Sequence, residues 1–503
     1  MTAQLIAGDP HDTALAAQVH PPDWRNPTPR DRYHLVVIGA GTGGLVTAAA
    51  AAGLGARVAL VERHLMGGDC LNVGCVPSKA VISAARAWHA AREAASRFGG
   101  PAATGPGDFA AAMERMRRLR AGLSPIDGAA RFRDLGVDVF LGEGRFTGRG
   151  TITAGDHALR FRRAVVATGA RAAVPPIPGL AEAGCLTNES VFTLTALPPR
   201  LAVIGGGPIG CELAQAFRRF GAEVTIIDAA PRLLPRDDAD AAALLADQLV
   251  SEGIRLLTSA KVHGVARVGE GRELSIEHPG GTTRLTVDQV IVAAGRRPNL
   301  EGLGLDLAGI AATPAGITVD DRLRTTNPAA YAVGDVCSRF QFTHSADFQA
   351  RLVVQNALFF GRARASRLVI PWCSYTSPEV AQVGLTAAEA ASRGVPHDVV
   401  RVGVEHLDRA VLEGETRGFA KFILARGSDR ILGATLVGAD AGDLIGEVAL
   451  AMTNGLGLGA IGRTMHPYPT RGEILRKAAD AWRRGRLTPT VRRIFSTWFR
   501  IFR

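Results

Sequence analysis

One sequence pattern occurs twice in this chain and restricts its fold more than any other feature. In the first copy, an apolar strand at residues 33–38 leads into Gly39-Ala40-Gly41-Thr42-Gly43-Gly44, an alanine-rich helix and a strand that ends at Glu62. Gly39 permits a tight turn, Gly41 lets a pyrophosphate approach the backbone, and Gly44 allows close packing of helix on strand. Glu62, about 20 residues further on, can accept hydrogen bonds from a ribose.

The second copy has the same order of elements. Residues 201–204 lead into a loop in which Gly205, Gly207 and Gly210 take the three glycine positions, and Asp228 is the acid. Either copy alone could be an α/β turn without a ligand. Because strand, helix and acid recur together, we interpret the pair as an internal repeat of two dinucleotide-binding domains. Asp228 suits a free ribose 2′-hydroxyl and so favours NADH over NADPH, although Arg232 and Arg236 follow closely and could offset its charge.

Two cysteines, Cys70 and Cys75, lie between these copies at the start of an apolar helix, and Lys79 follows Cys75 by about one helical turn. A helix N-terminus and a nearby ammonium group stabilise a thiolate, which is the reactive form of cysteine. The pair could instead be two small buried residues or half of a metal site. Zinc usually needs closer cysteine spacing and a second ligand pair, and none is visible nearby, so we predict a redox-active disulfide and no metal site.

Length and composition restrict the class of protein. A chain of 503 residues needs two to four domains. With 59 glycines and 21% charged residues it is typical of a soluble α/β enzyme, and it has neither a long apolar run nor a secretory signal. Six cysteines form no structural framework, so a reducing cytoplasm is expected. The net charge of +11 comes mostly from arginine, and no nucleic-acid-binding motif accompanies it, so no nucleic-acid partner is predicted.

The remaining pattern predicts a second kind of module. Helices are expected near 78–98 and 108–123, and strands lead into Gly169, Gly295 and the Gly334-Asp335 pair. From about residue 370 the strands become longer and alternate. We expect strands at 374–383, 399–404, 419–424 and 431–437, with helices near 386–393, 441–454 and 471–485. These elements indicate an α+β module.

The order of these pieces resembles the class I pyridine nucleotide–disulfide oxidoreductases, and within them mercuric-reductase-like members, over about residues 33–485. The motif Gly68-Asp69-Cys70-Leu71-Asn72-Val73-Gly74-Cys75-Val76-Pro77-Ser78-Lys79 is specific to that family. The resemblance implies an α/β fold with two Rossmann-like domains of the three-layer ββα type and a C-terminal α+β dimerisation domain. The implied division is an arm at 1–32, an FAD-binding domain at 33–197, an NAD(P)-binding domain at 198–297, a central FAD-binding part at 298–368, a dimerisation domain at 369–485 and a tail at 486–503.

The resemblance also implies cofactors and residue roles. FAD would occupy the first glycine loop, with Glu62 on its ribose, Lys79 beside the flavin and Asp335 beside the ribityl chain. Gly144 and Gly169 would line that site. The second loop would hold NADH or NADPH, with Val262 and Gly295 as further contacts, and Glu212 would pair with Lys79. Electrons would pass from nicotinamide to flavin to the Cys70–Cys75 disulfide, with Cys75 nearer the flavin and Cys70 meeting the substrate. The C-terminal module would form a homodimer, and its turn would reach the partner's cysteines.

That turn departs from the disulfide reductases of the family, which carry His-Pro-Thr-x-x-Glu. Here Tyr468 replaces the histidine, Glu473 is retained and His466 lies two residues earlier. Mercuric reductases also have this tyrosine, but they carry a vicinal cysteine pair near the C-terminus, and this chain has no cysteine after Cys373. We therefore predict transfer to a metal ion, a quinone or another small oxidant. The alternatives are a dihydrolipoamide-dehydrogenase-type enzyme with His466 as the base, and a non-catalytic redox-sensing flavoprotein.

The two ends of the chain lie outside the resemblance. Residues 1–32 are rich in proline, histidine and aspartate, and we expect an irregular arm. The tail has Val491, Ile494, Phe495, Trp498 and Phe502 at near-helical spacing, with Arg492, Arg493, Arg500 and Arg503 between them. It could be a basic amphipathic helix on the anionic inner face of a membrane, or a helix docked on its own dimer.

Overall fold

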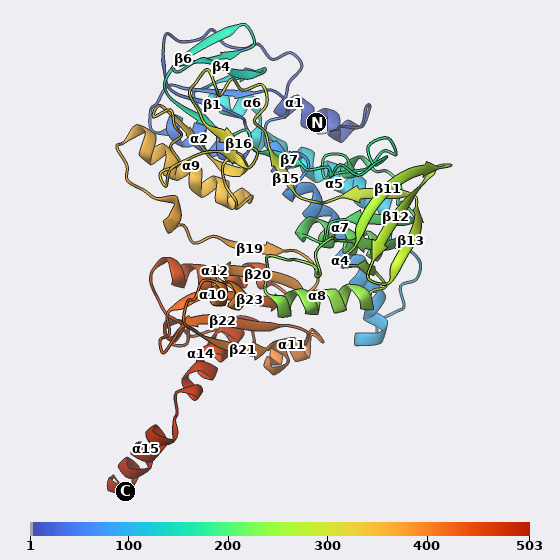
Figure 1. The fold of residues 1–503 in the computed structure, drawn as a ribbon, viewed down its shortest axis with the longest axis vertical. Coiled ribbons are helices and arrows are strands. Elements are labelled where there is room, and N and C mark those ends of the chain that lie inside the picture. Colours follow the sequence, from blue (N-terminus) through green and yellow to red (C-terminus); the bar gives the residue numbers. More distant parts are fainter. Residues whose placement is uncertain (1–3, 503) are drawn as a thin grey trace.

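The computed structural model describes residues 4–502 and contains two α/β domains, each built on a parallel sheet, and a C-terminal domain (Figure 1). In the first domain, the parallel sheet runs β3-β2-β1-β6, with β18 also on β6, and β6 continues into an antiparallel extension with β5 and β4. These strands are β1 (Tyr33–Ile38), β2 (Val58–Glu62), β3 (Val137–Leu141), β4 (Gly144–Gly148), β5 (Thr151–Ala154), β6 (His157–Val166) and β18 (Ala330–Ala332).

Side chains of β1 alternate between two apolar layers of the first domain. Leu35 and Val37 belong to the layer formed with α2 (Thr42–Gly53) and α9 (Thr343–Leu358), whereas Val36 and Ile38 belong to the layer formed with β4 and β5. This alternation is the period of two expected of a strand that is buried on both faces. The result is the three-layer arrangement predicted from the sequence, and that fold class is confirmed.

The second domain repeats this plan. Its parallel sheet has the order β10-β9-β8-β14, and a three-stranded antiparallel sheet β11-β12-β13 lies beside it. The elements are α7 (Pro208–Phe220), α8 (Ala239–Ser251), β8 (Arg200–Ile204), β9 (Glu223–Ile227), β10 (Arg255–Leu257), β11 (Lys261–Val268), β12 (Gly271–His278), β13 (Gly281–Val287) and β14 (Gln289–Val292).

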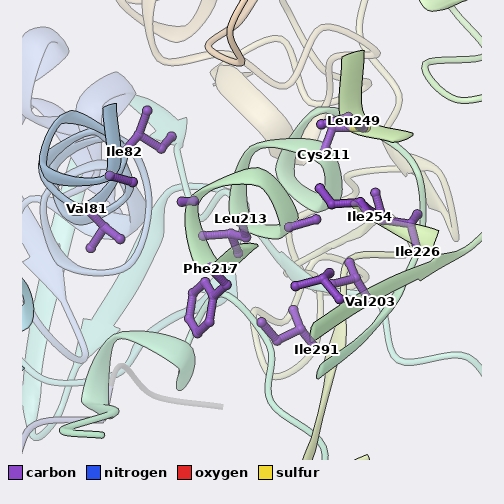
Figure 2. Close-up of a cluster of buried hydrophobic side chains, with 14 of the residues drawn as sticks. Val81, Ile82, Val203, Cys211, Leu213, Phe217, Ile226, Leu249, Ile254 and Ile291 are labelled. Atoms are coloured by element: carbon purple, nitrogen blue, oxygen red, sulfur yellow. The ribbon is translucent and has the colours of Figure 1, made fainter. Parts of the chain in front are cut away.

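A hydrophobic core joins the cysteine helix to the second domain. The cysteines lie at α3 (Gly68–Asn72) and at the first residue of α4 (Cys75–Phe98), and α5 (Phe109–Leu123) packs on α4. Val81 and Ile82 of α4 share one buried cluster with Leu213 and Phe217 of α7 (Figure 2). Because α7 begins at the second glycine loop, this core places the cysteine pair relative to that loop.

The C-terminal domain is a five-stranded antiparallel sheet of order β19-β20-β23-β22-β21. One part of the strand prediction is wrong, because the stretch expected as a single strand at 374–383 is two strands, β19 (Pro371–Ser374) and β20 (Glu379–Gly384). Pro378 has no N–H for a strand ladder, and the Ser377 N–H donates to Gln215 of α7. The other elements are β21 (His397–Gly403), β22 (Phe419–Ala425), β23 (Ile431–Gly438), α10 (Ala387–Ser392), α11 (Asp408–Leu412), α12 (Ala441–Thr453), α13 (Leu458–Ile461) and α14 (Glu473–Gly485).

The expectation of an irregular N-terminal arm is also wrong over α1 (Pro10–Val19). Asp9 caps this helix by accepting from the N–H groups of His11 and Asp12, and Leu15 is buried. Asp12 and Arg120 of α5 form a fully buried ion pair at 2.5 Å. A helix of ten residues, held in part by a capping aspartate and a buried ion pair, is too short to show a clear apolar period in the sequence.

The remaining helices and strands are α6 (Ala129–Asp134), which packs on β3, the paired strands β7 (Ala170–Ala172) and β15 (Arg296–Pro298), the paired strands β16 (Ala312–Thr313) and β17 (Gly316–Ile317), and α15 (Pro489–Ile501). No helix within residues 4–502 is both long enough and apolar enough to span a membrane. Arg503 of the predicted tail and residues 1–3 of the predicted arm lie outside the described residues.

Candidate active site

A single cleft of about 2870 Å³ brings together most of the site residues expected from the sequence. It is lined by the backbone or side chains of Gly39, Gly41, Glu62, Cys70, Cys75, Lys79, Gly169, Gly205, Gly207, Glu212, Asp228, Val262, Gly295 and Asp335. The cleft therefore contains both glycine loops and the cysteine pair, although these lie far apart in sequence.

The glycines of both loops are required by close backbone packing. Gly39 has φ +102°, and a Cβ at Gly44 would lie 1.7 Å from the Gly39 carbonyl oxygen. In the second loop a Cβ at Gly210 would lie 1.9 Å from the Gly205 oxygen. A larger residue at either inner position would separate the helix from its strand, so the helix N-terminus could not present its N–H groups to a phosphate. Both loops therefore meet the packing requirement of a dinucleotide-binding turn.

The two acids end their strands at the edge of the cleft. The Glu62 carboxylate accepts from the N–H groups of Ala40 (2.6 Å) and His64 (2.8 Å), and burial raises its pKa. Asp228 accepts from the N–H groups of Gly206 and Ala230. The Arg232 guanidinium donates to the backbone oxygens of its own loop, namely Leu234, Pro235 and Asp237. Arg232 is thus bonded within its loop rather than to Asp228.

Cys75 has the environment of a reactive thiolate. Its Sγ lies 3.3 Å from Thr343 Oγ1. The pKa of Cys75 is lowered to about 6, first by the hydrogen bond from Cys70 and then by Thr343 and Lys79, which together outweigh its burial. The same hydrogen bond and burial raise the pKa of Cys70. Both cysteines are free thiols in the structure, so one thiolate and one thiol form an asymmetric pair.

Lys79 and Glu212 form an ion pair at 2.6 Å beside the cysteines. The Glu212 side chain is almost fully buried, and its second oxygen accepts from the Tyr375 N–H at 2.8 Å. The Lys79 ammonium also lies 4.5 Å from the centre of the Tyr375 ring. These contacts fix the ammonium at the wall of the cleft and leave no oxygen of the buried carboxylate without a partner.

Sequence analysis did not identify Arg296, which joins two parts of the site. Its guanidinium contacts Asp69, next to the first cysteine, and lies 3.2 Å from Asp335. Burial opposes the charge of Arg296, but the two carboxylates outweigh it and raise its pKa. Burial raises the pKa of Asp335, and the positive charge of Arg296 partly offsets that rise. The only sequence signal was the position of Arg296 directly after Gly295.

The comparisons identify the family to which these features belong. Residues 33–350 match the family model described as pyridine nucleotide-disulphide oxidoreductase, and residues 370–479 match the dimerisation domain of that family. The chain is a pyridine nucleotide-disulphide oxidoreductase. The predicted use of FAD and NAD(P)H and the assignment as a redox enzyme are thereby confirmed.

Individual relatives place this oxidoreductase among the mercuric-reductase-like members of the family, as predicted. A mercuric reductase of Streptomyces lividans is 36% identical over 467 residues, covering 90% of this chain and 96% of the relative. A dihydrolipoyl dehydrogenase of Bacillus subtilis (strain 168) is 32% identical over 470 residues, covering 89% and 98%. Among solved structures, the HOCl-induced flavoprotein disulfide reductase RclA from Escherichia coli has a TM-score of 0.80 at 30% identity, covering 89% of this chain and 99% of that one.

The predicted residues of the C-terminal turn do not line the cleft of their own subunit. Tyr468 is 71% exposed, and its hydroxyl donates to Asp408 at 2.7 Å, which raises its pKa. His466 lies 3.2 Å from Glu447. Glu473 is buried at the start of α14 and pairs with an arginine of that helix. The structure thus leaves this turn on the surface of a domain that forms dimers in the family.

Two further findings concern the walls of the oxidoreductase site. Gly144, the first residue of β4, does not line the cleft. It packs against Ile38, and a Cβ at this position would lie 2.9 Å from the Ile38 side chain. An aromatic ladder that sequence analysis missed does line the cleft, next to Thr343. The Phe342 ring stacks with the His344 and Trp372 rings, with ring centres 5.4 and 6.2 Å apart respectively. Phe342 and His344 are two residues apart, but Trp372 comes from β19, so no local sequence motif connects all three rings.

Proposed function

We propose that this oxidoreductase uses NADH and FAD to reduce a Cys70–Cys75 disulfide and passes the electrons to a metal ion, a quinone or another small oxidant. The observation that supports this most directly is the single cleft, which contains the glycine loops and the asymmetric cysteine pair, whereas the tyrosine-bearing turn lies outside it at the surface. The glycine loops would hold the cofactors that supply electrons to the two sulfurs. The tyrosine at the turn disfavours a substrate whose departing thiolate must be protonated.

The chain's own residues have distinct tasks in this proposal. Gly39, Gly41 and Glu62 would hold FAD, which when bound supplies the ring that accepts a hydride from nicotinamide and reduces the disulfide. Lys79, held by Glu212, keeps a positive charge close to Cys75. Cys75 remains a thiolate near neutral pH, while Cys70 carries the proton and is the sulfur offered to the oxidant.

The electron balance of the second half-reaction is simple. Oxidation of the Cys75 thiolate and the Cys70 thiol releases two electrons and one proton and forms the disulfide. Two Cu²⁺ ions would each accept one electron, one Hg²⁺ ion would accept both, and a quinone would accept both together with that proton and one from solvent. A thiol pair is a soft ligand set that suits copper and mercury. The relatives named mercuric reductase and the solved Cu(II) complex of RclA favour a metal ion among these acceptors.

A dihydrolipoamide-dehydrogenase-type reaction is the second candidate, because relatives of similar identity carry that name. It would need a base at the C-terminal turn. Tyr468 is poorly suited to this task, because its hydrogen bond to Asp408 raises a pKa that is already high. His466 would have to act in its place, on the cysteines of the partner subunit.

The proposed nicotinamide is NADH, and the proposed setting is a cytoplasmic homodimer. Asp228 would bring its carboxylate close to the 2′-phosphate of NADPH, and the nearby Arg232 is bonded to its own loop. The dimerisation domain at 370–479 supports a homodimer. A cytoplasm keeps thiols reduced, which suits an enzyme that works through a dithiol.

Steady-state assays would test the proposal, with NADH and NADPH against Cu²⁺, Hg²⁺, lipoamide, glutathione disulfide and a soluble quinone. We expect turnover with NADH and a metal ion or quinone, and loss of that turnover in Cys75→Ser. Efficient lipoamide turnover that collapses in His466→Ala but persists in Tyr468→Phe would support the second candidate and contradict the first. Failure of NADH to bleach the flavin absorbance would instead indicate a non-catalytic flavoprotein.

A further inference from the structure

The last helix, α15 (Pro489–Ile501), has two chemically opposite faces. At about 100° per residue, its apolar side chains and Phe502 fall within one arc of roughly 160°. They are Val491, Ile494, Phe495, Trp498, Phe499, Ile501 and Phe502. Arg492, Arg493, Arg500 and Ser496 occupy the opposite arc. The Trp498 and Phe502 rings touch on the apolar face, with centres 4.1 Å apart.

The apolar face of α15 is uncovered in the described chain. No residue of the helix is buried, and Figure 1 shows α15 extending beyond α14 and the rest of the C-terminal domain. Ile494 is 62% exposed and Phe499 is 68% exposed. The helix is nonetheless well defined at its start, because Thr488 accepts from the Val491 N–H and Pro489 takes the first position. A row of exposed aromatic and aliphatic side chains of this size indicates a binding surface.

The charge around this surface has one sign. Asp480 is the last acidic residue of the chain, and every charged residue after it is an arginine. These arginines flank the apolar arc rather than interrupt it. An interface with a protein partner commonly mixes both signs, whereas a bilayer that contains anionic lipids offers negative headgroups above an apolar interior. The charge pattern therefore selects the lipid surface.

The match to the dimerisation domain of the family ends before α15 begins. The dimerisation domain ends at residue 479, within α14. Apolar residues of α14, such as Leu475 and Ala479, are buried in the domain core, and those of α15 are not.

We propose that α15 docks the protein on the surface of a bilayer that contains anionic phospholipids. The helix lies in the plane of the interface, with Trp498, Phe495 and Ile494 among the acyl chains and Arg492, Arg493 and Arg500 at the headgroups. Tryptophan and arginine both favour this depth. The proposal depends only on α15 and is independent of the electron acceptor.

Co-sedimentation of the purified full-length holoenzyme with vesicles tests this. The vesicles are phosphatidylcholine alone, or phosphatidylcholine with about a third phosphatidylglycerol, at about 0.1 M and about 0.5 M salt. We expect binding to the anionic vesicles that weakens in pure phosphatidylcholine and at high salt. Trp498→Asp should weaken binding on the order of tenfold or more, and each of Arg492→Gln and Arg493→Gln by about fivefold.

Ser496→Ala is the matched control, because it changes the polar arc without removing charge and should bind as the unaltered protein does. Sedimentation equilibrium of Trp498→Asp without lipid provides the second readout. An unchanged dimer together with lost vesicle binding supports the proposal. A dimer that dissociates in Trp498→Asp would show that the helix packs on its own subunits and would overturn it. Absence of binding to anionic vesicles, or binding equal in all variants, would also overturn it.

Discussion

Removal of the Cys70 thiol should raise the pKa of Cys75. The hydrogen bond that Cys70 donates is the largest of the effects that lower this pKa to about 6. At pH 7 a thiol with that pKa is about nine-tenths thiolate, whereas an unperturbed cysteine is a few per cent thiolate. In Cys70→Ala the donor is lost while Thr343 and Lys79 remain, so the midpoint should rise by about one unit or more.

The assay is the pH dependence of alkylation of Cys75 by iodoacetamide in the reduced protein, followed by peptide mass spectrometry. Burial raises the pKa of Cys337 to about 12 and raises the pKa of Cys211 and Cys373, so these thiols should stay unreactive below pH 8. Half-maximal reaction is expected near pH 6 in the unaltered protein. Cys70→Ser keeps a hydroxyl donor and should shift the midpoint less than Cys70→Ala. A midpoint near pH 8.5 in the unaltered protein, or one unmoved in Cys70→Ala, would refute the argument.

Three further substitutions test the nucleotide loops and the N-terminal helix. Gly44→Ala should yield protein with little bound FAD, measured by absorbance, because the new Cβ would lie 1.7 Å from the Gly39 oxygen. Gly53→Ala in the same helix is the control, because a Cβ there meets nothing within 4 Å and the flavin should be retained. Equal flavin content in the two variants would contradict this. Asp228→Ala should reduce the ratio of kcat/KM for NADH over NADPH on the order of tenfold, and an unchanged ratio would argue against a role in discrimination. Asp12→Ala should lower the free energy of unfolding by about 3–5 kcal/mol in urea because it leaves the buried Arg120 unpaired, and a loss below about 1 kcal/mol would show that the site is hydrated.

Local spacing was sufficient to predict the features that depend on contiguous residues. The glycines of both loops, the acids Glu62 and Asp228, and the position of Cys75 at a helix N-terminus all follow from short segments whose backbone geometry admits few residue types. The contact between Glu212 and Lys79 was predicted from the family resemblance and not from sequence spacing. That contact joins residues in different domains and depends on the packing of α4 on α7.

What sequence analysis missed depends on tertiary packing. Arg296 meets Asp69 and Asp335 only because three separate segments converge on the cleft. The Phe342–Trp372 stack likewise joins a loop before α9 to β19. The helix α1 was missed because only Leu15 and Val19 pack into the core, which is too few for a clear apolar period, and because the Asp9 cap and the Asp12–Arg120 pair produce no apolar signal.

Anaerobic titration of the purified protein with dithionite or NADH, monitored by absorbance, measures the central claim most directly. A flavin in electronic contact with the Cys70–Cys75 disulfide should take up two electron pairs per subunit. The first pair should produce a long-wavelength band from the Cys75 thiolate beside the flavin. Uptake of one pair, without that band, would contradict the account.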